Sequence, residues 1–517
     1  MNSKQGYIIQ KLIGCISLTL FLLAAKPDVL AQSGFAKAIP INANVDIDDI
    51  LYHEDQLILR GNIAIDSLSL WGLLLAGLDT MGNVLWTSVK YDTSLSTHII
   101  LNTPGRFLVT SDQRLIVPAK YYNTGRLAVY FTDLEGNEIF HKFYPYEGRN
   151  LFPYDINEIG DEYFITGVIS YLGGDLSMFA LKLKANGDMV WIKYYGQPNL
   201  FEESIDADVN ANNTLTLYAA RNDLDFLHSG TKDGWKQPWL LTIDTAGVIV
   251  EEWLGEENDP RTLGGEYFCR MENGDWIMQS THYSNINGPF GEEVKVSPTI
   301  TRLDSQFNLI WKVYLTNFQE RFDQIFDMEF DPLTNQIIVS GDKLIPIGNT
   351  KEYVNWTVKL DTSGQILWNK TDTIYFSRQN AHYTAGLDIA PSGSIYVGGY
   401  VTVNELEPRS QAFVIKYTSD GCSDTLCTTT SINEQIKQAD LPLVMYPNPA
   451  SDVLHVLVRE TTGSCQMQLS DMHGRIVSTS RIITGSQDIA LDLPAGVYIA
   501  TFTNATGIFY SRKLIVY

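Results

Sequence analysis

Basic residues, cysteine and histidine are all scarce in this sequence. The 517 residues include five cysteines and eight histidines, and 37 basic against 60 acidic residues give a net charge of −23. A chain this acidic lacks the basic surface that holds phosphates, which argues against nucleic-acid binding. No CxxC pair or His-rich tract indicates a zinc site. With 44% hydrophobic and 11% aromatic residues, the chain can nevertheless bury a core.

Long hydrophobic runs are missing except at the N-terminus. Lys4 and Lys11 flank the start of an apolar stretch, residues 12–25, that is short for a membrane span. Val29-Leu30-Ala31 fits the small-residue cleavage rule, so we predict a signal peptide at residues 1–31 and no transmembrane span in the mature chain. A membrane anchor is the alternative, which the polar break at residues 26–28 disfavours.

Recognisable catalytic motifs are also missing. The chain has no HExxH pair, no GxSxG elbow, no Walker loop and no GxGxxG turn between a strand and a helix. The acidic segments 46–49 and 223–225 lack the ligand spacing and glycine of an EF-hand loop. We therefore predict no catalytic residues, no metal site and no cofactor. Ca²⁺ is left open only because the chain is so acidic.

One sequence motif recurs seven times. It begins with an Asp or an equivalent residue, continues through a tight turn that usually contains glycine, and ends in an apolar stretch that often holds tryptophan. The turn positions are 82, 136, 187, 247, 307, 364 and 421, spaced 51 to 60 residues apart. This length suits a four-stranded propeller blade, and Asp-x-x-Gly is typical of a hairpin turn. Four tryptophans share one phase, so we interpret them as blade-to-blade packing residues rather than a ligand ladder: Trp86, Trp191, Trp311 and Trp368.

A β-like segment with small residues precedes each turn phrase, and helical periodicity is not sustained anywhere in this region. These segments are 57–62, 115–120, 164–170, 215–220, 276–280, 337–341 and 395–400. The pattern predicts an all-β protein with a seven-bladed β-propeller over residues 32–430. The last repeat lacks an outer strand, and we expect Phe35–Ile41 to supply it and close the ring. Closure by residues 424–429 is the alternative.

These Leu-Asp-x-x-Gly-x-x-x-Trp repeats resemble those of exported seven-bladed propellers and, more weakly, the quinoprotein (PQQ) repeat. The resemblance covers residues 34–427. It implies the fold but not an activity, because propellers host many unrelated functions. A quinoprotein dehydrogenase would need a calcium and cofactor ligands that the sequence does not offer.

The composition changes after a linker at residues 431–440. Residues 441–517 hold five basic and five acidic residues, and their short alternating segments predict a small Ig-like β-sandwich. Four segments resemble, in order, the motifs of the type A sorting domain of the type IX secretion system. The motif residues are Tyr446, Pro447, Asn448, Pro449, Asp471, Gly474, Arg475, Gly496 and Tyr498, followed by the terminal strand Arg512–Val516.

The sorting-domain resemblance implies a two-step export route. The signal peptide takes the chain to the periplasm, and the type IX machinery then moves it across the outer membrane, either released or attached to the cell surface. An Ig-like binding module is the alternative for this tail.

Two predicted loops between the second and third strands of a blade are long and lie in neighbouring blades, at residues 221–236 and 281–297. With the link at 254–263 they are expected to converge on one face. Their aromatic, carboxylate and amide groups suit carbohydrate or peptide recognition. The predicted ligand-binding residues are Asp223, Asp225, His228, Trp235, His282, Tyr283, Asn285, Asn287 and Phe290. Neutral growth of these loops is the alternative.

The sequence favours a non-enzymatic binding or adhesion platform for an extracellular glycan or protein. The alternative is a secreted polysaccharide hydrolase or lyase that uses acidic residues on the loop-rich face. Glycoside hydrolysis needs two carboxyl groups about 5–10 Å apart, a distance that no sequence motif supplies.

Overall fold

Every regular element that the computed structural model describes is a β-strand. The description covers residues 34–423 and 443–516, except 66–69, 92–98, 101–104, 122–123, 145–149, 171–175, 198–199, 224–236, 256–261, 272, 289–290, 317–322, 348–349, 375–380, 403–408, 447–449, 451–452, 459–464, 472–474 and 505–506. Within these ranges no helix has the length and hydropathy to cross a membrane. The chain divides into two compact units, residues 1–428 and 429–517. The predicted signal peptide lies outside the described residues.

Antiparallel sheets repeat along the first unit, each built largely from consecutive strands. The strand groups are β2 (Val45–His53), β3 (Gln56–Ile65), β4 (Leu70–Asp79) and β5 (Val84–Lys90); β6 (Ile99–Ile100), β7 (Leu108–Val109), β8 (Leu115–Tyr121), β9 (Arg126–Thr132) and β10 (Glu138–Phe143); β11 (Asn150–Ile159), β12 (Glu162–Ser170), β13 (Leu176–Lys184) and β14 (Met189–Tyr195); β15 (Leu200–Val209), β16 (Leu215–Asp223), β17 (Gln237–Ile243) and β18 (Ile249–Leu254); β19 (Thr262–Arg270), β20 (Trp276–Gly288), β21 (Gly291–Leu303) and β22 (Leu309–Tyr314); β23 (Gln324–Asp331), β24 (Gln336–Ile347), β25 (Thr350–Asp361) and β26 (Ile366–Asp372); and β27 (Ala381–Ile389), β28 (Ile395–Thr402) and β29 (Ser410–Tyr417).

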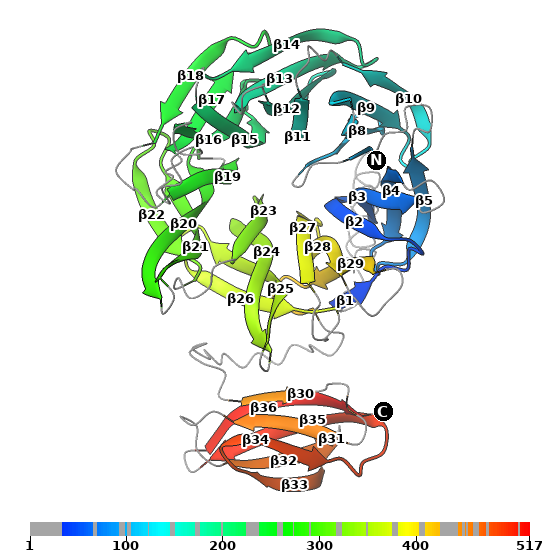
Figure 1. The fold of residues 1–517 in the computed structure, drawn as a ribbon, viewed down its shortest axis with the longest axis vertical. Helices are drawn as coiled ribbons and strands as arrows, with labels where there is room; N and C mark the ends of the chain where they lie inside the picture. The colour runs from blue at the N-terminus through cyan, green and yellow to red at the C-terminus, as the bar shows by residue number, and fades with distance from the viewer. Residues whose placement is uncertain are drawn as a thin grey trace, which may run out of the picture. The chain divides into compact units, whose positions relative to one another are not determined.

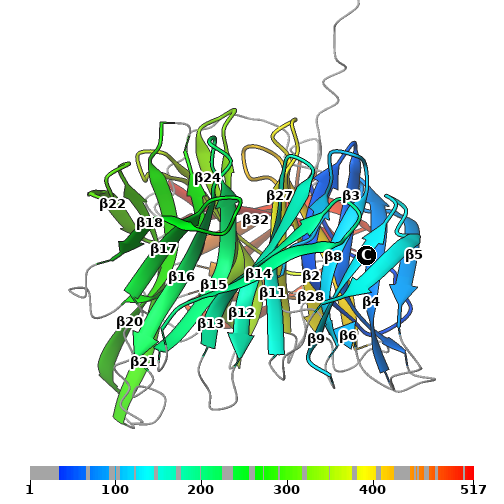
Figure 2. The same cartoon turned by 90° about the horizontal axis from the view of Figure 1, so that it is seen from above.

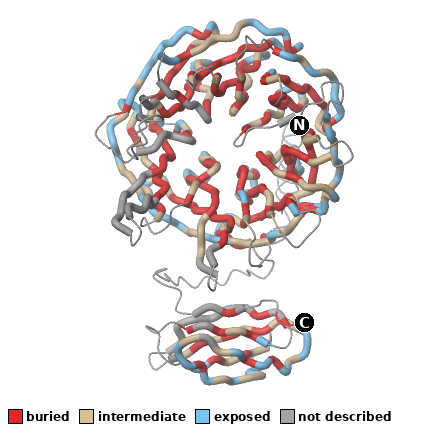
Figure 3. Tube along the Cα trace, in the orientation of Figure 1, coloured by how far each residue is buried: buried red, intermediate tan, exposed pale blue. Residues whose placement is uncertain are grey.

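These sheets stand around a common centre as the blades of a β-propeller. Strands such as β2, β11, β15 and β23 lie nearest the centre, and β5, β14, β18 and β26 form the rim (Figure 1). Figure 2 shows the blades edge-on. Burial follows the same arrangement, because exposed residues gather on the rim strands and buried ones on the strands inside them (Figure 3). The all-β propeller fold predicted from the repeats is therefore confirmed.

The Asp-x-x-Gly turns form tight, self-contained hydrogen-bond networks. Asp79 Oδ1 accepts the backbone N–H groups of Met81 and Asn83, at 2.9 and 2.8 Å, and its Oδ2 accepts from Asn83 Nδ2 at 2.8 Å. Gly82 completes the turn with a φ of 71°, a value that favours glycine. The same pattern recurs at the turn that begins with Asp133. One short polar segment is therefore enough to join the two outer strands of a blade.

The tryptophans after these turns pack between blades, as predicted. A Cβ on Gly136 would lie 2.8 Å from Cζ3 of Trp86, so the indole covers the turn glycine of the next blade. The β19–β22 blade departs from this rule because its turn carries Phe307 with a φ of 65°. The preceding blade has Trp253, two residues beyond the usual position, and its ring stacks on Phe307 with centroids 4.7 Å apart. A large turn residue and a shifted tryptophan thus replace the usual pair.

The first strand of the chain closes the ring. β1 (Phe35–Ala38) pairs antiparallel with β29, from Phe35 opposite Lys416 to Ala38 opposite Phe413. A hydrophobic cluster also joins the two ends, since Ile47 of β2 and Val414 of β29 belong to it. This arrangement confirms the prediction that an N-terminal segment supplies the missing outer strand. Beyond the last strand, Cys422 is engaged in a disulfide, whereas Cys269 and Cys465 are free.

The second unit is a small β-sandwich around its own apolar core. One sheet holds β30 (Leu443–Tyr446), β31 (Val453–Val458) and β34 (Gly485–Ala490), and the other holds β32 (Cys465–Asp471), β33 (Ile476–Ile482), β35 (Gly496–Asn504) and β36 (Gly507–Val516). Leu454, Met467 and Phe502 are among its fully buried residues. The alternating segments of the sequence thus became strands, because one face of each sheet had to be covered.

Candidate functional site

The predicted ligand-binding residues fall into two groups in the structure. Asp223 ends β16, and His282, Tyr283, Asn285 and Asn287 all belong to β20. Asp225, His228, Trp235 and Phe290 lie outside the described residues.

The second of the two predicted loops is a hairpin rather than a loop. β20 and β21 remain paired from Trp276 opposite Leu303 to Gly288 opposite Gly291. The neighbouring strand β19 pairs with β20 only as far as His282, and β22 pairs with β21 only from Thr299. Among the described strands, residues 283–288 and 291–296 therefore pair only with each other. We call this extension the β20–β21 ribbon. Figure 2 shows the two strands running beyond the ends of the neighbouring blades.

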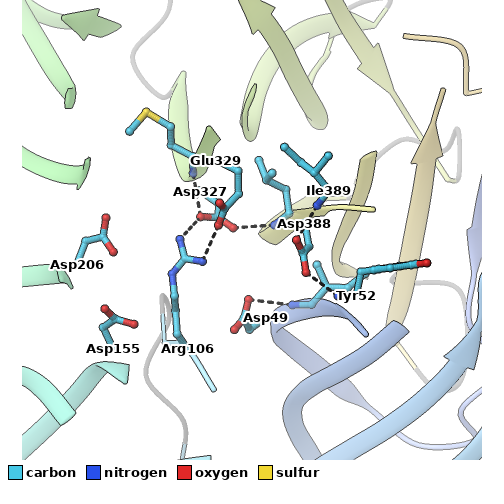
Figure 4. Close-up of polar contacts among 12 residues, drawn as sticks. Asp49, Tyr52, Arg106, Asp155, Asp206, Asp327, Glu329, Asp388 and Ile389 are labelled. Atoms are coloured by element: carbon cyan, nitrogen blue, oxygen red, sulfur yellow. Dashed lines mark hydrogen bonds and ion pairs between the residues drawn. The ribbon is translucent and has the colours of Figure 1, made fainter. Parts of the chain in front are cut away.

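A second polar feature, which sequence reasoning missed, lies at the propeller axis. The innermost strands β2, β11, β15 and β23 each contain a bulge, and an aspartate follows each bulge: Asp49, Asp155, Asp206 and Asp327. These aspartates are buried, with exposures between 2% and 7%. A bulge interrupts the regular alternation of side chains along a strand. The carboxyl groups that follow these bulges therefore point toward the propeller axis and the neighbouring blade (Figure 4).

Each of these carboxyl groups joins its own blade to the next. Asp155 Oδ2 accepts the N–H of Ala207 at 3.0 Å, Asp206 Oδ2 that of Phe268 at 2.9 Å, and Asp327 Oδ2 that of Leu387 at 2.7 Å. Asp49 accepts that of Phe107 at 3.4 Å. We call these contacts the aspartate clasps. They give acceptors to backbone N–H groups of buried residues, which would otherwise be costly to leave without a partner.

The β27–β29 blade uses a different aspartate for its clasp. Gly386 occupies the position that follows the bulge in β27. A Cβ there would lie 2.7 Å from Oδ1 of Asp49, so the small residue makes room for the carboxyl group of the adjacent blade. Two residues later, Asp388 Oδ2 accepts the N–H of Tyr52 at 2.6 Å and so connects the last blade to the first.

Arg106 places a guanidinium group among these carboxyl groups. Its backbone N–H donates to Tyr154 at 2.8 Å, whereas its side chain reaches across the axis to the β23–β26 blade. There it pairs with Asp327 at 2.5 Å and with Glu329 at 3.1 Å (Figure 4). The Arg106 side chain is 26% exposed and that of Asp327 is 3% exposed. One residue therefore ties three blades together.

Burial raises the pKa values of these carboxyl groups. Desolvation raises the pKa of Asp49 to about 8 and that of Asp388 to about 6, against an opposing effect of Arg106 on both. It also raises the pKa values of Asp155, Asp206, Asp327 and Glu329, which Arg106 again moderates. Strongly shifted pKa values mark catalytic sites, but structural ion-pair networks shift them in the same way. Since every clasp aspartate holds a backbone N–H of the next blade, we interpret the cluster as structural.

The described residues include no group of His, Cys, Asp or Glu side chains arranged to hold a metal ion.

The sequence does carry a signal for the clasps. An aspartate followed by an apolar residue recurs in the first strand of several blades, 12 to 14 residues before a small residue of the next strand, as in Asp155 before Gly167 and Asp327 before Gly341. The bulges explain part of this spacing, because a Cβ on Gly341 would lie 2.0 Å from the carbonyl oxygen of Gln324. Arg106 has no counterpart in the other repeats and could not have been found in this way.

The sorting-motif residues that the structure describes serve local turns. Asp471 accepts the N–H of Arg475 at 3.0 Å and pairs with its Nε at 3.1 Å. Tyr498 donates its hydroxyl to the carbonyl of Pro494 at 2.7 Å, and Gly496 begins β35. Tyr446 is opposite His455 at the end of β30, while Pro447, Asn448, Pro449 and Gly474 lie outside the described residues.

Comparison with known proteins locates one family on this chain. Residues 444–517 match the model of the secretion system C-terminal sorting domain. No characterised protein matches the chain by sequence.

Solved structures with a similar arrangement share little sequence with the chain. The β-propeller domain of the Trilobed protease from Pyrococcus furiosus has 8% identity and a TM-score of 0.40, covering 75% of this chain and 99% of its own. A family PL25 ulvan lyase has 7% identity and a TM-score of 0.47, covering 75% and 96%. Drosophila Semaphorin 2a has 8% identity and a TM-score of 0.43, covering 93% and 98%. None of these likenesses bears on activity. Residues 444–517 thus carry a secretion system C-terminal sorting domain, and a β-propeller precedes it.

Proposed function

We propose that this chain is a secreted or surface-attached propeller that binds an extracellular glycan or protein without converting it. The proposal includes a signal peptide at residues 1–31, seven blades over residues 32–430, a linker at 431–440 and a type A sorting domain at 441–517. The signal peptide would take the chain to the periplasm, and the sorting domain would engage the type IX machinery. The match over residues 444–517 supports this export route.

The observation that carries the binding role is the β20–β21 ribbon. It extends by six residues per strand beyond its blade, or roughly 20 Å at the rise of a β-strand. Backbone pairing continues up to Gly288 opposite Gly291, so the extension is a built element rather than a long irregular loop. Tyr283, Asn285 and Asn287 occupy alternate positions along it. A rigid scaffold that presents polar and aromatic residues at its edge is how many binding proteins are built.

The axial carboxyl groups favour binding over catalysis. A glycosidase needs one carboxyl group free to donate a proton and another free to attack or to activate water. The clasp aspartates instead accept backbone N–H groups from adjacent blades, and Asp327 and Glu329 share Arg106. Their raised pKa values follow from burial in the structural seam and do not require a reaction to explain them.

A shortened variant tests the proposal. His282 and Ser297 are cross-strand partners, so residues 283–296 can be replaced by an Asn-Gly turn that keeps this pair at the top of the blade. The mature chain, residues 32–517, and this variant are screened on a glycan array and for the release of reducing ends. Binding of at least one ligand without release, lost in the variant, is the expected result. Leu333→Ala is the control that should bind normally, because Leu333 is 77% exposed and lies in the turn between β23 and β24.

Two outcomes would overturn the proposal. Release of sugar that disappears with the ribbon would establish a polysaccharide-degrading enzyme instead. Survival of the binding of every ligand after ribbon removal would place recognition elsewhere on the propeller. Thermal unfolding of each protein checks that the shortened chain still folds.

A further inference from the structure

Three tyrosines lie close together on two neighbouring blades, neither of which is the blade that carries the β20–β21 ribbon. Tyr383 on β27 and Tyr400 on β28 are cross-strand partners, and their rings stack with centroids 4.8 Å apart and planes inclined by 18°. Tyr353 on β25 pairs in parallel with Ala381, two residues before Tyr383. We call Tyr353, Tyr383 and Tyr400 the tyrosine row. Tyr383 is 38% exposed, and the other two are half-buried.

Acidic side chains accompany the tyrosine row. Burial, followed by the carboxyl groups of Asp342 and Asp46, raises the pKa of Tyr383. Burial also raises the pKa of Tyr400, with further contributions from Asp46, Tyr383, Asp48 and Asp342. The groups that shift the pKa values of these two phenols are carboxyl groups and a neighbouring phenol, and no basic group is among them, so they offer an anion no positive partner.

The neighbouring aspartates are held in place by the fold. Asp46, on the first strand of the β2–β5 blade, accepts the hydroxyl of Ser410 from the last blade at 2.8 Å. Asp342, on β24, accepts the N–H of Thr384 at 2.9 Å. The row therefore lies where the last blade meets the β23–β26 blade, and Asp46 adds the β2–β5 blade to the surface around it. Such a surface is preorganised, which lowers the entropic cost of binding a ligand.

We propose that the tyrosine row binds a glycan without acidic groups, with Tyr383 as the stacking platform and Asp46 as an acceptor for sugar hydroxyls. An exposed phenol ring offers a flat apolar face for the carbon skeleton of a sugar, and its hydroxyl offers a polar edge. Carboxylate oxygens accept hydrogen bonds from hydroxyl groups. A uronate or sulfated sugar would bring its charge toward the partly exposed Asp46, so the same surface discriminates against acidic glycans.

This inference rests on the proposed binding function and adds a site and a ligand class to it. The test measures binding of the mature chain, residues 32–517, to cellohexaose, mannohexaose and xylohexaose by calorimetry, with hexagalacturonate as the acidic counterpart. At least one neutral oligosaccharide is expected to bind, and hexagalacturonate is expected to bind at least roughly tenfold more weakly.

Point variants locate the site. Tyr383→Ala should weaken neutral-sugar binding roughly tenfold, whereas Tyr383→Phe keeps the ring and should bind nearly as the parent does. Asp46→Asn, which keeps the shape of the side chain, should weaken discrimination against hexagalacturonate. Tyr91→Ala is the matched control, because Tyr91 is 52% exposed and lies outside the row. Thermal unfolding confirms that each variant folds.

The outcomes separate this inference from the proposed function. Sugar binding that persists in Tyr383→Ala but disappears with the β20–β21 ribbon overturns the tyrosine row and leaves the binding function standing. Equal binding of neutral and acidic hexasaccharides overturns the ligand class. Binding of a protein ligand with no binding of any sugar also overturns the tyrosine row while the platform function stands. Release of sugar by the parent chain would overturn the non-enzymatic function itself.

Discussion

Replacing Arg106 by methionine tests whether the axial cluster stabilises the propeller. The substitution keeps an unbranched side chain but removes the guanidinium group that pairs with Asp327 at 2.5 Å and Glu329 at 3.1 Å. It removes a positive partner from these carboxyl groups and from Asp155 and Asp206, and it leaves Asp49 with Arg60 alone. The blades would then be held by clasps whose acceptors repel one another.

The expected loss follows from the burial of the pair. Breaking a buried ion pair by removing one partner costs about 3–5 kcal/mol. Because the Arg106 side chain is 26% exposed, we expect the lower end, about 3 kcal/mol of unfolding free energy at pH 8. The loss should shrink to about 1 kcal/mol at pH 5, because the unpaired carboxyl groups can take up protons there and lose their charge.

Tryptophan fluorescence during urea unfolding measures this loss. All ten tryptophans lie between Trp71 and Trp368, so the signal reports on the propeller and not on the sorting domain. The control is Lys142→Met, which breaks a 2.7 Å ion pair with Asp188 on the exposed rim and should leave the midpoint unchanged. An Arg106→Met protein with an unchanged midpoint at pH 8, or with the same loss at pH 5, would refute the reasoning.

Three further predictions address the pH response, the blade contacts and the ring closure. The pKa values of Asp49, about 8, and Asp388, about 6, exceed the usual value of about 4, so the folded chain binds more protons than the unfolded chain. The urea midpoint should therefore fall as the pH rises from 5 to 8.5, and Asp49→Asn should flatten this slope; a midpoint that rises instead would contradict the assignment. In a double-mutant cycle, Trp253→Ala and Phe307→Ala should show a coupling energy of about 1 kcal/mol in the same urea assay, whereas additive losses would mean that the stacked pair contributes no energy of its own. Deleting residues 32–38 removes β1 and exposes β29 as an edge strand, so light scattering after gel filtration should detect oligomers; a monomer of parental stability would show that closure does not depend on this strand.

The hairpin turns illustrate why much of the propeller could be predicted from the sequence. Each Asp-x-x-Gly turn is stabilised by contacts within five residues, such as those of Asp79 with Met81 and Asn83. Local contacts of this kind leave a local sequence pattern, and repetition makes the pattern visible. The sandwich strands were predictable for a related reason, since their apolar and polar residues alternate with the period of a strand.

The ligand surface was less accessible to sequence reasoning. Residues 281–297 have the polar composition of a loop, yet β20 and β21 stay paired through most of this segment. Pairing there depends on a partner strand and on the blade beneath it, and the composition of the segment records neither. The tyrosine row was missed because Tyr353, Tyr383 and Tyr400 come from different strands of two blades.

The sequence by itself determined the β-class, the repeat and the identity of the C-terminal domain, because each leaves a short or periodic signature, whereas it only favoured an N-terminal closing strand over residues 424–429. Only the tertiary structure decided what meets at the axis. Arg106 and Asp327 are 221 residues apart, and their pairing depends on the ring bringing opposite blades together. The raised pKa of Asp49 likewise exists only after folding, because folding buries the carboxyl group and removes the water that stabilises its charged form.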